Sequence, residues 1–300
     1  MDRFESMSAF VAVVEAGGFS AAARRLAMPL ATVSRKVSEL ENQLRVQLLT
    51  RTTRKVALTD IGRYHFETCR RLLEELDEAE RLATGEYGAP RGDLIVTAPL
   101  LFGRLYLAPI VTEFLAAYAE VDVQLRLADR IANLGEEGVD IAIRVGHLPD
   151  STLKAVKLGV IRQVVCASPD YLARNGIPER LTDLSLHHSI TCTSLEALRE
   201  WTFRTRREMI RVPVRSRLSV STAEAAADAA VAGLGITRLL CYQVSAPISD
   251  GRLRLLLRDY EPEPLPVHLV YQTERRLAGK LTSFIDFVVP RMKQKMVFNP

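Results

Sequence analysis

The first sixty residues repeat apolar side chains at helical spacing. The earliest set predicts a helix that Gly17 and Gly18 end, and it consists of Phe4, Met7, Phe10, Val11 and Val14. A second, short helix runs from Ser20, which can cap it, to about Ala27. After a turn at Pro29, a third helix carries one apolar stripe for a core, formed by Val33, Val37, Leu40 and Leu44.

The outer side of the third helix carries hydrogen-bond donors, which are Thr32, Ser34, Arg35 and Lys36. Two helices joined by a short turn, with donors on the exposed face of the second, have the outline of a helix-turn-helix. Downstream, Val56 and Leu58 alternate with other residues, which predicts one arm of a short β-hairpin. We interpret this hairpin as a wing whose tip, rich in Arg and Thr, reaches the minor groove or the DNA backbone.

The distribution of charge supports a polyanionic partner. The whole chain has a net charge of only +4, but nine basic residues lie between Ser20 and Arg63, against Glu39, Glu41 and Asp60. A local excess of this kind fits nucleic acid binding. A solvated charged surface is the alternative interpretation.

A long amphipathic helix is predicted from Asp60 to about Tyr87, capped by Thr59 or Asp60. Its apolar strip consists of Ile61, Phe66, Cys69, Leu72, Leu73, Leu76 and Leu82. Because the small preceding domain cannot cover the whole strip, we expect antiparallel pairing with a second copy of the chain. A partner helix within the same chain is the alternative. Several breaking residues then mark a linker, namely Gly85, Gly88, Pro90 and Gly92.

Beyond Arg91, strand patterns alternate with helical ones, which predicts parallel sheets with crossover helices. The first unit is expected to contain strands at 94–98, 121–127 and 139–143 and helices at 102–118 and 133–137. The second unit is expected to contain strands at 163–167 and 236–240 and helices at 222–232 and 242–249. A strand at 267–271 and a helix at 277–289 then return to complete the first unit.

Catalytic and metal-binding patterns are absent from the sequence. It contains no GxSxG, P-loop, GxGxxG or HExxH, and its five histidines form only one adjacent pair, His187-His188. The four cysteines show no C-x-x-C spacing, so we expect buried reduced thiols, with a redox-sensing pair as the alternative. We therefore expect no enzyme, no metal and no cofactor.

The sequence also lacks signals for export or membrane insertion. No leader of basic residues and an apolar core opens the chain, and no apolar run approaches 18 residues. We therefore expect a cytoplasmic protein without membrane contact. The α/β units alone would also suit a transport-type solute-binding protein, but the missing secretion signal and the N-terminal basic helices argue against that alternative.

Over essentially its whole length, the chain resembles the LysR-type transcriptional regulators. The N-terminal segments that carry the resemblance are MDRFESMSAFVAVVEAGGFSAAARRLAM, TVSRKVSELENQL and RTTRKVALTDIG. The C-terminal segments are TAPLLFGRLYLAPIVTEFLAAY, GVDIAIRVG, ASPDYLARNGIP and AAVAGLGITRLL. The resemblance is specific because several spaced elements match in the same order.

The resemblance implies a multidomain fold with three parts. Residues 1–59 form an all-α winged helix-turn-helix, and residues 60–90 form a linker helix that makes dimers. Residues 91–300 form a periplasmic-binding-protein-like effector domain of two Rossmann-like halves, one at about 91–162 and 267–300, the other at about 163–266. The implied partners are double-stranded promoter DNA, a small organic acid or aromatic effector, further copies of the chain up to a tetramer, and RNA polymerase.

The resemblance also assigns DNA contacts to individual residues. They are Ser20, Leu30, Ala31, Thr32, Ser34 and Arg35 on the helices and Arg51, Thr53 and Arg54 on the wing. Arg35 is the strongest candidate because it can contact a guanine edge bidentately or bind a phosphate. The chain departs from the family at Pro29, where a capping Ser is frequent, and at Leu30, where Gln or Pro is common. Leu30 cannot hydrogen-bond a base edge.

Effector contacts are expected in the cleft between the two halves. The candidates are Pro99, Leu100, Leu101, Phe102, Arg144, Gly146, Thr193, Ser194, Ser221, Thr222, Thr237 and Arg238. In the family, the helix start near Leu101 suits a carboxylate or similar anion, and a Ser frequently stands there. The Leu at this position suggests a less polar ligand or one that is anchored elsewhere. For each polar candidate, a helix cap or a surface role is the alternative, and Phe102 is expected in the core rather than in the cleft wall.

Overall fold

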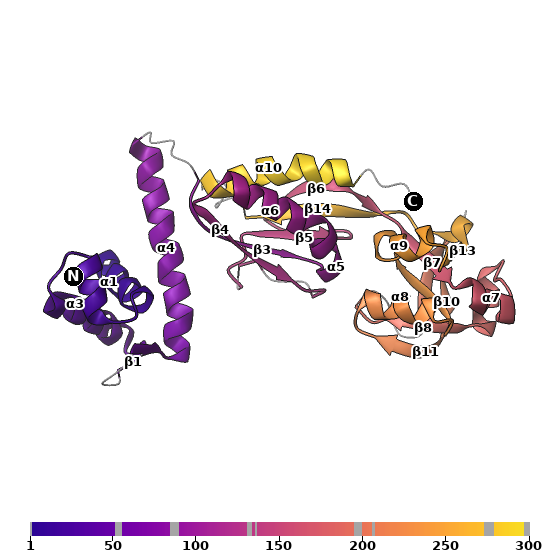
Figure 1. Ribbon diagram of the computed structural model, residues 1–300, viewed down its shortest axis with the longest axis horizontal. Coiled ribbons are helices and arrows are strands. Elements are labelled where there is room, and N and C mark those ends of the chain that lie inside the picture. Colours follow the sequence, from indigo (N-terminus) through magenta and orange to yellow (C-terminus); the bar gives the residue numbers. More distant parts are fainter. Residues whose placement is uncertain are drawn as a thin grey trace. The chain divides into compact units, whose positions relative to one another are not determined.

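The computed structural model describes residues 2–51, 56–84, 90–130, 134–135, 137–194, 200–205, 208–272 and 279–296 (Figure 1). The chain forms two compact units, Met1–Ala89 and Pro90–Pro300, which we call the N-terminal and the C-terminal unit. The elements of the N-terminal unit are α1 (Arg3–Glu15), α2 (Phe19–Arg25), α3 (Leu30–Leu44), β1 (Leu49–Arg51), β2 (Val56–Leu58) and α4 (Asp60–Thr84).

The core of the N-terminal unit forms around α1, which packs against α2, α3 and α4. The stripe predicted for α3 is confirmed, because Val33, Val37 and Leu40 are all buried. They join Phe10, which is fully buried, in one hydrophobic cluster. The Asp2 carboxylate caps α1 by accepting a hydrogen bond from the Phe4 amide at 2.9 Å.

The start of α2 differs from the prediction. Gly18 is the N-cap, no side chain caps the helix, and Ser20 lies inside the first turn. The N-cap therefore lies two residues earlier than predicted, and Phe19, the first helical residue, packs against the hydrophobic cluster. Helix α3 begins at Leu30, so Pro29 is its N-cap and not, as predicted, a residue of the first turn. The helix ends where Arg45 adopts the left-handed conformation with φ 57°.

The predicted hairpin is present as the antiparallel pair β1–β2, in which Leu49 faces Leu58. Its tip, residues 52–55, lies outside the described residues. The Glu41 carboxylate of α3 accepts hydrogen bonds from the amides of Leu48 (2.8 Å) and Leu49 (3.0 Å), which ties the hairpin to the helix. Thr59 caps α4, because its Oγ1 accepts the Gly62 amide at 2.9 Å.

The predicted apolar strip of α4 divides between two directions. Phe66, Cys69 and Leu73 pack into the core of the N-terminal unit. Ile61 and Leu72, by contrast, remain 56% and 40% exposed. Only part of the strip therefore packs into the core of this unit.

The C-terminal unit contains two five-stranded sheets (Figure 1). The first sheet has the order β4 (Val121–Leu127), β3 (Gly92–Ala98), β5 (Ile141–Val145), β14 (Leu265–Tyr271) and β6 (Lys154–Ile161). The second sheet has the order β11 (Arg215–Val220), β8 (His188–Cys192), β12 (Ile236–Leu240), β7 (Gln163–Ala167) and β13 (Arg254–Leu256). A separate antiparallel hairpin consists of β9 (Glu200–Arg204) and β10 (Met209–Pro213).

The expectation of purely parallel sheets is wrong, because both sheets are mixed. Strand β3 is parallel to β4 and β5, and β8 is parallel to β11 and β12. Strands β14 and β7, however, run antiparallel to their neighbours. The chain crosses from the first sheet to the second after β6 and returns before β14. The first strand after each crossing, β7 or β14, runs antiparallel to its neighbours in the sheet that it enters.

Helices and short helical turns pack against the two sheets. They are α5 (Leu100–Phe102), the π-helical turn η1 (Gly103–Leu107), α6 (Ala108–Ala117), α7 (Pro169–Asn175), α8 (Ala223–Val231), α9 (Ser245–Ser249), α10 (Gly279–Lys295) and the 3-10 turns η2 (Leu181–Leu186), η3 (Cys241–Gln243) and η4 (Arg258–Tyr260). The helix predicted at 133–137 is not formed by the described residues, which make turns there.

The single helix predicted at 102–118 is three consecutive segments, α5, η1 and α6. The π-helical turn begins at Gly103, where an added Cβ would lie 2.2 Å from Leu127 Cδ2, so the sheet approaches the backbone closely. The stretch Leu100–Ala117 is long and apolar enough to cross a membrane by length and composition. Its buried residues, however, include Phe102, which is 0% exposed in the main hydrophobic core, as expected for a core helix.

Gly62 offers a direct test of the contact between α4 and the hairpin. A Cβ at this position would lie 1.9 Å from the backbone oxygen of Leu48, which cannot move aside as a side chain could. We expect Gly62→Ala to lower the free energy of unfolding of the N-terminal unit by about 1–3 kcal/mol. The measurement is urea unfolding of the full chain, followed by circular dichroism.

The control is Gly18→Ala, which meets no atom within 4 Å and should cost about 1 kcal/mol or less, the effect of replacing an N-cap glycine by alanine. Fluorescence of Trp201, the only tryptophan, reports the C-terminal unit and should keep its wild-type midpoint in both variants. Equal stability of Gly62→Ala and wild type would contradict the close contact.

Candidate functional site

The outward face of α3 presents the residues that the sequence assigns to DNA. Leu30 is 49% exposed, Ala31 and Arg35 are also exposed, and Thr32 and Ser34 are half-buried. Ser20 is exposed in the first turn of α2. This face follows from packing, since the opposite side of α3 is buried against α1.

Ion pairs fix two of the basic side chains on this helix. Arg35 Nη1 lies 2.7 Å from Glu39 Oε1, one turn further along, while the Arg35 side chain stays 65% exposed. Lys36, which was expected on the outer side, instead pairs with Glu5 of α1, and only 12% of its side chain is exposed. The position of Lys36 on the helix turns it toward α1, so its expected place on the DNA-facing side is wrong.

The wing residues are only partly described. Arg51 ends strand β1, opposite Val56. Thr53 and Arg54 lie outside the described residues. The predicted DNA-contacting residues that the structure places therefore come from α2, α3 and the base of the hairpin.

The predicted effector residues at the start of α5 lie mainly in the core. Leu101 is 6% exposed and Phe102 is 0% exposed, so neither lines an open cleft. The Leu100 amide, which follows Pro99, donates a hydrogen bond to the Asp129 carboxylate at 3.0 Å. The Asp129 carboxylate thus accepts from a backbone amide that the family resemblance assigns to ligand binding.

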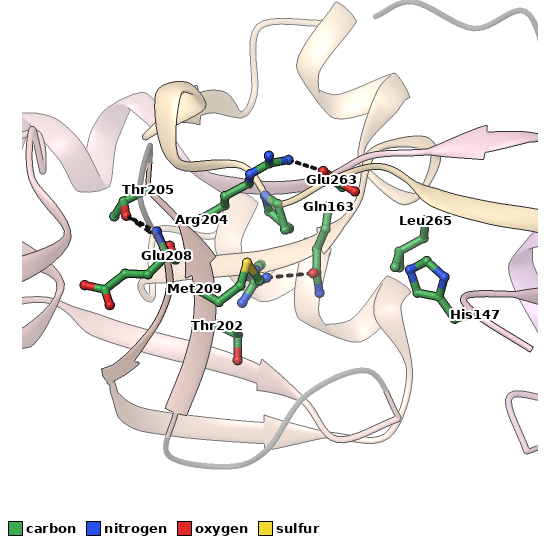
Figure 2. Close-up of a pocket in the computed structure, with 11 residues that line it drawn as sticks. His147, Gln163, Thr202, Arg204, Thr205, Glu208, Met209, Glu263 and Leu265 are labelled. Carbon is green, nitrogen blue, oxygen red and sulfur yellow. Dashed lines mark hydrogen bonds and ion pairs between the residues drawn. The ribbon is translucent and has the colours of Figure 1, made fainter. Parts of the chain in front are cut away.

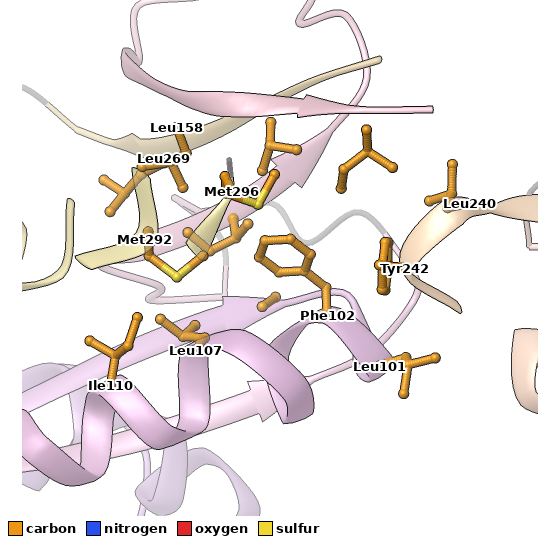
Figure 3. Packing of buried hydrophobic residues seen from close by; sticks show 14 of the residues in the cluster. Leu101, Phe102, Leu107, Ile110, Leu158, Leu240, Tyr242, Leu269, Met292 and Met296 are labelled. Carbon is orange, nitrogen blue, oxygen red and sulfur yellow. The ribbon is translucent and has the colours of Figure 1, made fainter. Parts of the chain in front are cut away.

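Phe102 belongs to an aromatic cluster that we define as Phe102, Tyr106 and Tyr242. Figure 3 shows Phe102 and Tyr242 facing one another. The Phe102 and Tyr242 rings meet edge to face with centroids 5.6 Å apart, and Tyr106 lies 5.9 Å from Tyr242. Burial raises the pKa of both tyrosines. The cluster joins α5 and η1, which lie beside the first sheet, to η3, which follows strand β12 of the second sheet. Aromatic side chains therefore fill the space between these elements.

In the second half of the unit, three of the six predicted effector residues, Thr193, Thr222 and Thr237, hydrogen-bond the protein backbone. Thr193 donates its amide to the Val220 carbonyl at 2.8 Å, and the buried Thr237 hydroxyl donates to the Ile190 carbonyl at 3.0 Å. Thr222 caps α8, directly after the exposed Ser221. The Ser194 hydroxyl lies 3.2 Å from Cys192 Sγ. These contacts fit the alternative interpretation as caps and turns.

Two further candidates, Arg144 and Gly146, lie near the end of β5 and directly after it. Arg144 is half-buried near the end of that strand. Gly146 has φ 110°, which favours glycine, and its amide donates to the Pro266 carbonyl at 2.8 Å. Their neighbour His147 is exposed and reaches a cavity that the sequence did not indicate.

This cavity has a volume of about 570 Å³, within the range of small-molecule sites (Figure 2). Its lining residues are His147, Gln163, Thr202, Arg204, Thr205, Glu208, Met209, Arg238, Pro262, Glu263 and Leu265. The hairpin side chains Thr202, Arg204 and Met209 lie on one side, and His147 and Leu265 lie on the other. The predicted candidates and the cavity share one residue, Arg238.

Arg238 is the buried charge of this cavity, with 3% exposure. Its Nη2 donates to Gln163 Oε1 at 2.7 Å, and its guanidinium lies over the Phe203 ring, 4.7 Å from the centroid. A buried guanidinium is a strong donor for an anionic group. At the rim, Arg204 of β9 pairs with Glu263, which precedes β14.

A large part of the cavity lining comes from the β9–β10 hairpin, which the sequence patterns had not predicted. Trp201 and Phe203 are buried and alternate with polar residues, a period-2 pattern that would have indicated a strand. No local pattern places Gln163 beside Arg238, since 75 positions separate them in the sequence. Only the antiparallel pairing of β7 and β12 brings them together.

Comparison with known proteins agrees with this architecture. Residues 4–63 match the family model described as bacterial regulatory helix-turn-helix protein, lysR family. Residues 88–293 match the family model described as LysR substrate binding domain. The two matches cover the hairpin-bearing helical unit and the two-sheet unit.

Individual relatives match along nearly the full chain. A transcriptional repressor of Pseudomonas aeruginosa is 34% identical, covering 96% of this chain and 92% of the relative. The transcriptional activator AaeR of Escherichia coli is 32% identical, covering 95% and 93%. The solved structure of CrgA from Neisseria meningitidis, a LysR-type transcriptional regulator, is 34% identical over 96% of this chain and 98% of its own, with a TM-score of 0.61. The chain therefore belongs to the LysR family, whose members are DNA-binding transcriptional regulators with an effector-binding domain.

Proposed function

We propose that the outward face of α3 reads promoter DNA and that residues 1–59 act as the DNA-binding domain. The observation that carries this proposal is the packing of α3, whose apolar side is buried while Leu30, Ala31 and Arg35 face solvent. Ser20, Thr32, Ser34 and the wing residues Arg51, Thr53 and Arg54 complete the proposed contacts. Basic side chains supply phosphate contacts and the helix supplies base contacts.

We propose that residues 60–90 pair two copies of the chain. Ile61, Tyr64 and Leu72 of α4 are 56%, 74% and 40% exposed, and their spacing places them along one side of the helix. A second α4 running antiparallel would cover them. The two α3 helices of such a dimer would enter successive major grooves roughly 34 Å apart. Pairing of dimers into a tetramer on DNA and contact with RNA polymerase extend this proposal.

Arg35 is the side chain on which we expect DNA affinity to depend most. Arg35→Ala should weaken binding to the DNA upstream of the protein's own gene by about 1–3 kcal/mol at one fixed salt concentration. If Arg35 contacts a guanine, its loss would relax the sequence preference. If it contacts a phosphate, its loss would make DNA affinity depend less steeply on salt concentration. Fluorescence anisotropy with labelled duplexes measures both.

Glu39→Gln is the matched control, because it releases Arg35 from its 2.7 Å ion pair without removing the guanidinium. This variant should bind at least as tightly as wild type. The assignment of Arg35 is wrong if Arg35→Ala binds with wild-type affinity under the same conditions.

For the effector, we propose that residues 91–300 bind a small organic acid or aromatic compound in the cavity that holds Arg238. The halves would be 91–162 with 267–300 and 163–266. Arg238 and Gln163 would bind the acidic group, and Met209 and Leu265 would contact the apolar body. A buried guanidinium at the cavity wall supports an anion. The ligand can change DNA binding only by favouring one arrangement of the regulator over another.

Arg238→Met tests this site. In a thermal-shift screen of benzoate, hydroxybenzoates and short dicarboxylates, a compound present at 100 times its Kd should raise the melting temperature of wild type by about 5–10 °C. The same compound should raise that of Arg238→Met by less than about 2 °C, because the charge that binds the acid is gone. Each shift is measured against the same variant without ligand.

Arg252→Met is the control, since Arg252 is exposed, pairs with Asp250 and does not line the cavity. It should keep the full shift. A wild-type shift in Arg238→Met would place the effector elsewhere, for example beside the candidates Thr193, Ser221 or Arg144.

A further inference from the structure

The end of α3 that begins the helix has an unusual surface for a DNA-reading element. Pro29, Leu30 and Ala31 are all exposed, and Leu30 is the first residue of the helix. Leu30 is one of few large hydrophobic side chains that the described part of the chain exposes, at 49%. Half of a leucine side chain is thus in water on the face that the family uses to bind DNA.

Charged groups begin only further along the same helix. Residues 29–34 carry no ionisable side chain. Arg35, in the second turn, has its guanidinium directed toward Glu39, and Lys36 is turned toward Glu5. The beginning of α3 therefore offers a DNA groove an apolar contact rather than a charge or a hydrogen-bond fork.

The major groove contains one apolar group among the base edges, the C5-methyl group of thymine. We propose that Leu30 is a specificity-determining residue that recognises a thymine methyl group at one position in each half-site of the operator. Apolar contact between the leucine and the methyl removes both from water, which favours binding. At a guanine or cytosine, the same leucine covers polar edges and satisfies none of them, which disfavours binding.

The proposal explains the two departures of the chain from its family in one way. Pro29 lacks an amide hydrogen and holds the backbone with φ −60° at the N-cap, so the start of α3 is rigid without a side-chain cap. A rigid start keeps Leu30 in one position relative to the groove. A leucine in place of a polar residue at position 30 then changes the base that is preferred, and base recognition at this position is kept.

The experiment removes one methyl group at a time from the DNA. A duplex that wild type selects from a random pool is resynthesised with each thymine of one half-site replaced in turn by deoxyuridine, which lacks only the methyl. Anisotropy titrations at one fixed salt concentration compare wild type with Leu30→Ala and with Leu30→Gln, a variant of similar length that can hydrogen-bond. Leu30 is exposed, so both variants should fold as wild type does.

We expect one position at which deoxyuridine weakens wild type about fourfold, the effect of burying about one methyl group. The same replacement should change binding of Leu30→Ala and Leu30→Gln by less than about 1.5-fold. Two results would overturn the proposal. One is a duplex in which no replacement weakens wild type; the other is a replacement that weakens all three proteins equally, which assigns the methyl to another side chain.

The inference rests on DNA binding through α3, and the two can fail separately. If α3 did not contact DNA, Arg35→Ala and both Leu30 variants would bind the unmodified duplex as wild type does. If α3 contacts DNA but Leu30 reads no methyl, Arg35→Ala would still weaken binding, while each deoxyuridine replacement would affect the Leu30 variants as it affects wild type.

Discussion

Burial of one stripe of α3 is the constraint on which the DNA-binding role depends. Val33, Val37 and Leu40 recur at helical spacing and are buried against α1, so the rotation of α3 about its own axis is fixed. Everything on the opposite side is then presented to solvent in a set direction. Glu41 adds a second restraint by binding the amides of Leu48 and Leu49, so the hairpin is held beside the helix.

In the C-terminal unit, two chain crossings join the sheets, and an ion pair links them. Arg162, between β6 and β7, lies 3.4 Å from Glu261, which precedes β14, and both are largely buried. Burial raises the pKa of the Glu261 carboxyl, and Arg162 opposes that rise. Away from the crossings, Phe102 and Tyr242 also join the two layers. A change in the angle between the layers must bend the crossings and separate these two rings.

The sequence predicted elements with a clear period and missed those defined by tertiary pairing. Strands at 121–127, 163–167 and 236–240 match the observed bounds because each is a short apolar or alternating run. The β9–β10 hairpin was not predicted, and with it a large part of the lining of the cavity around Arg238. Phe102 follows the strand end that family resemblance places near the ligand, and its burial confirms the interpretation of this side chain as part of the core.

The central claim, that the outward face of α3 lies in the major groove, can be tested by DNA cleavage from the helix itself. The four native cysteines are buried, so an iron chelate can be attached to Asn42→Cys, an exposed position two turns beyond Arg35 on the same face. With the full chain bound to DNA upstream of its own gene, we expect cuts clustered in two major grooves about one helical turn apart. Cuts scattered along the fragment, or none while the complex forms, would contradict the account.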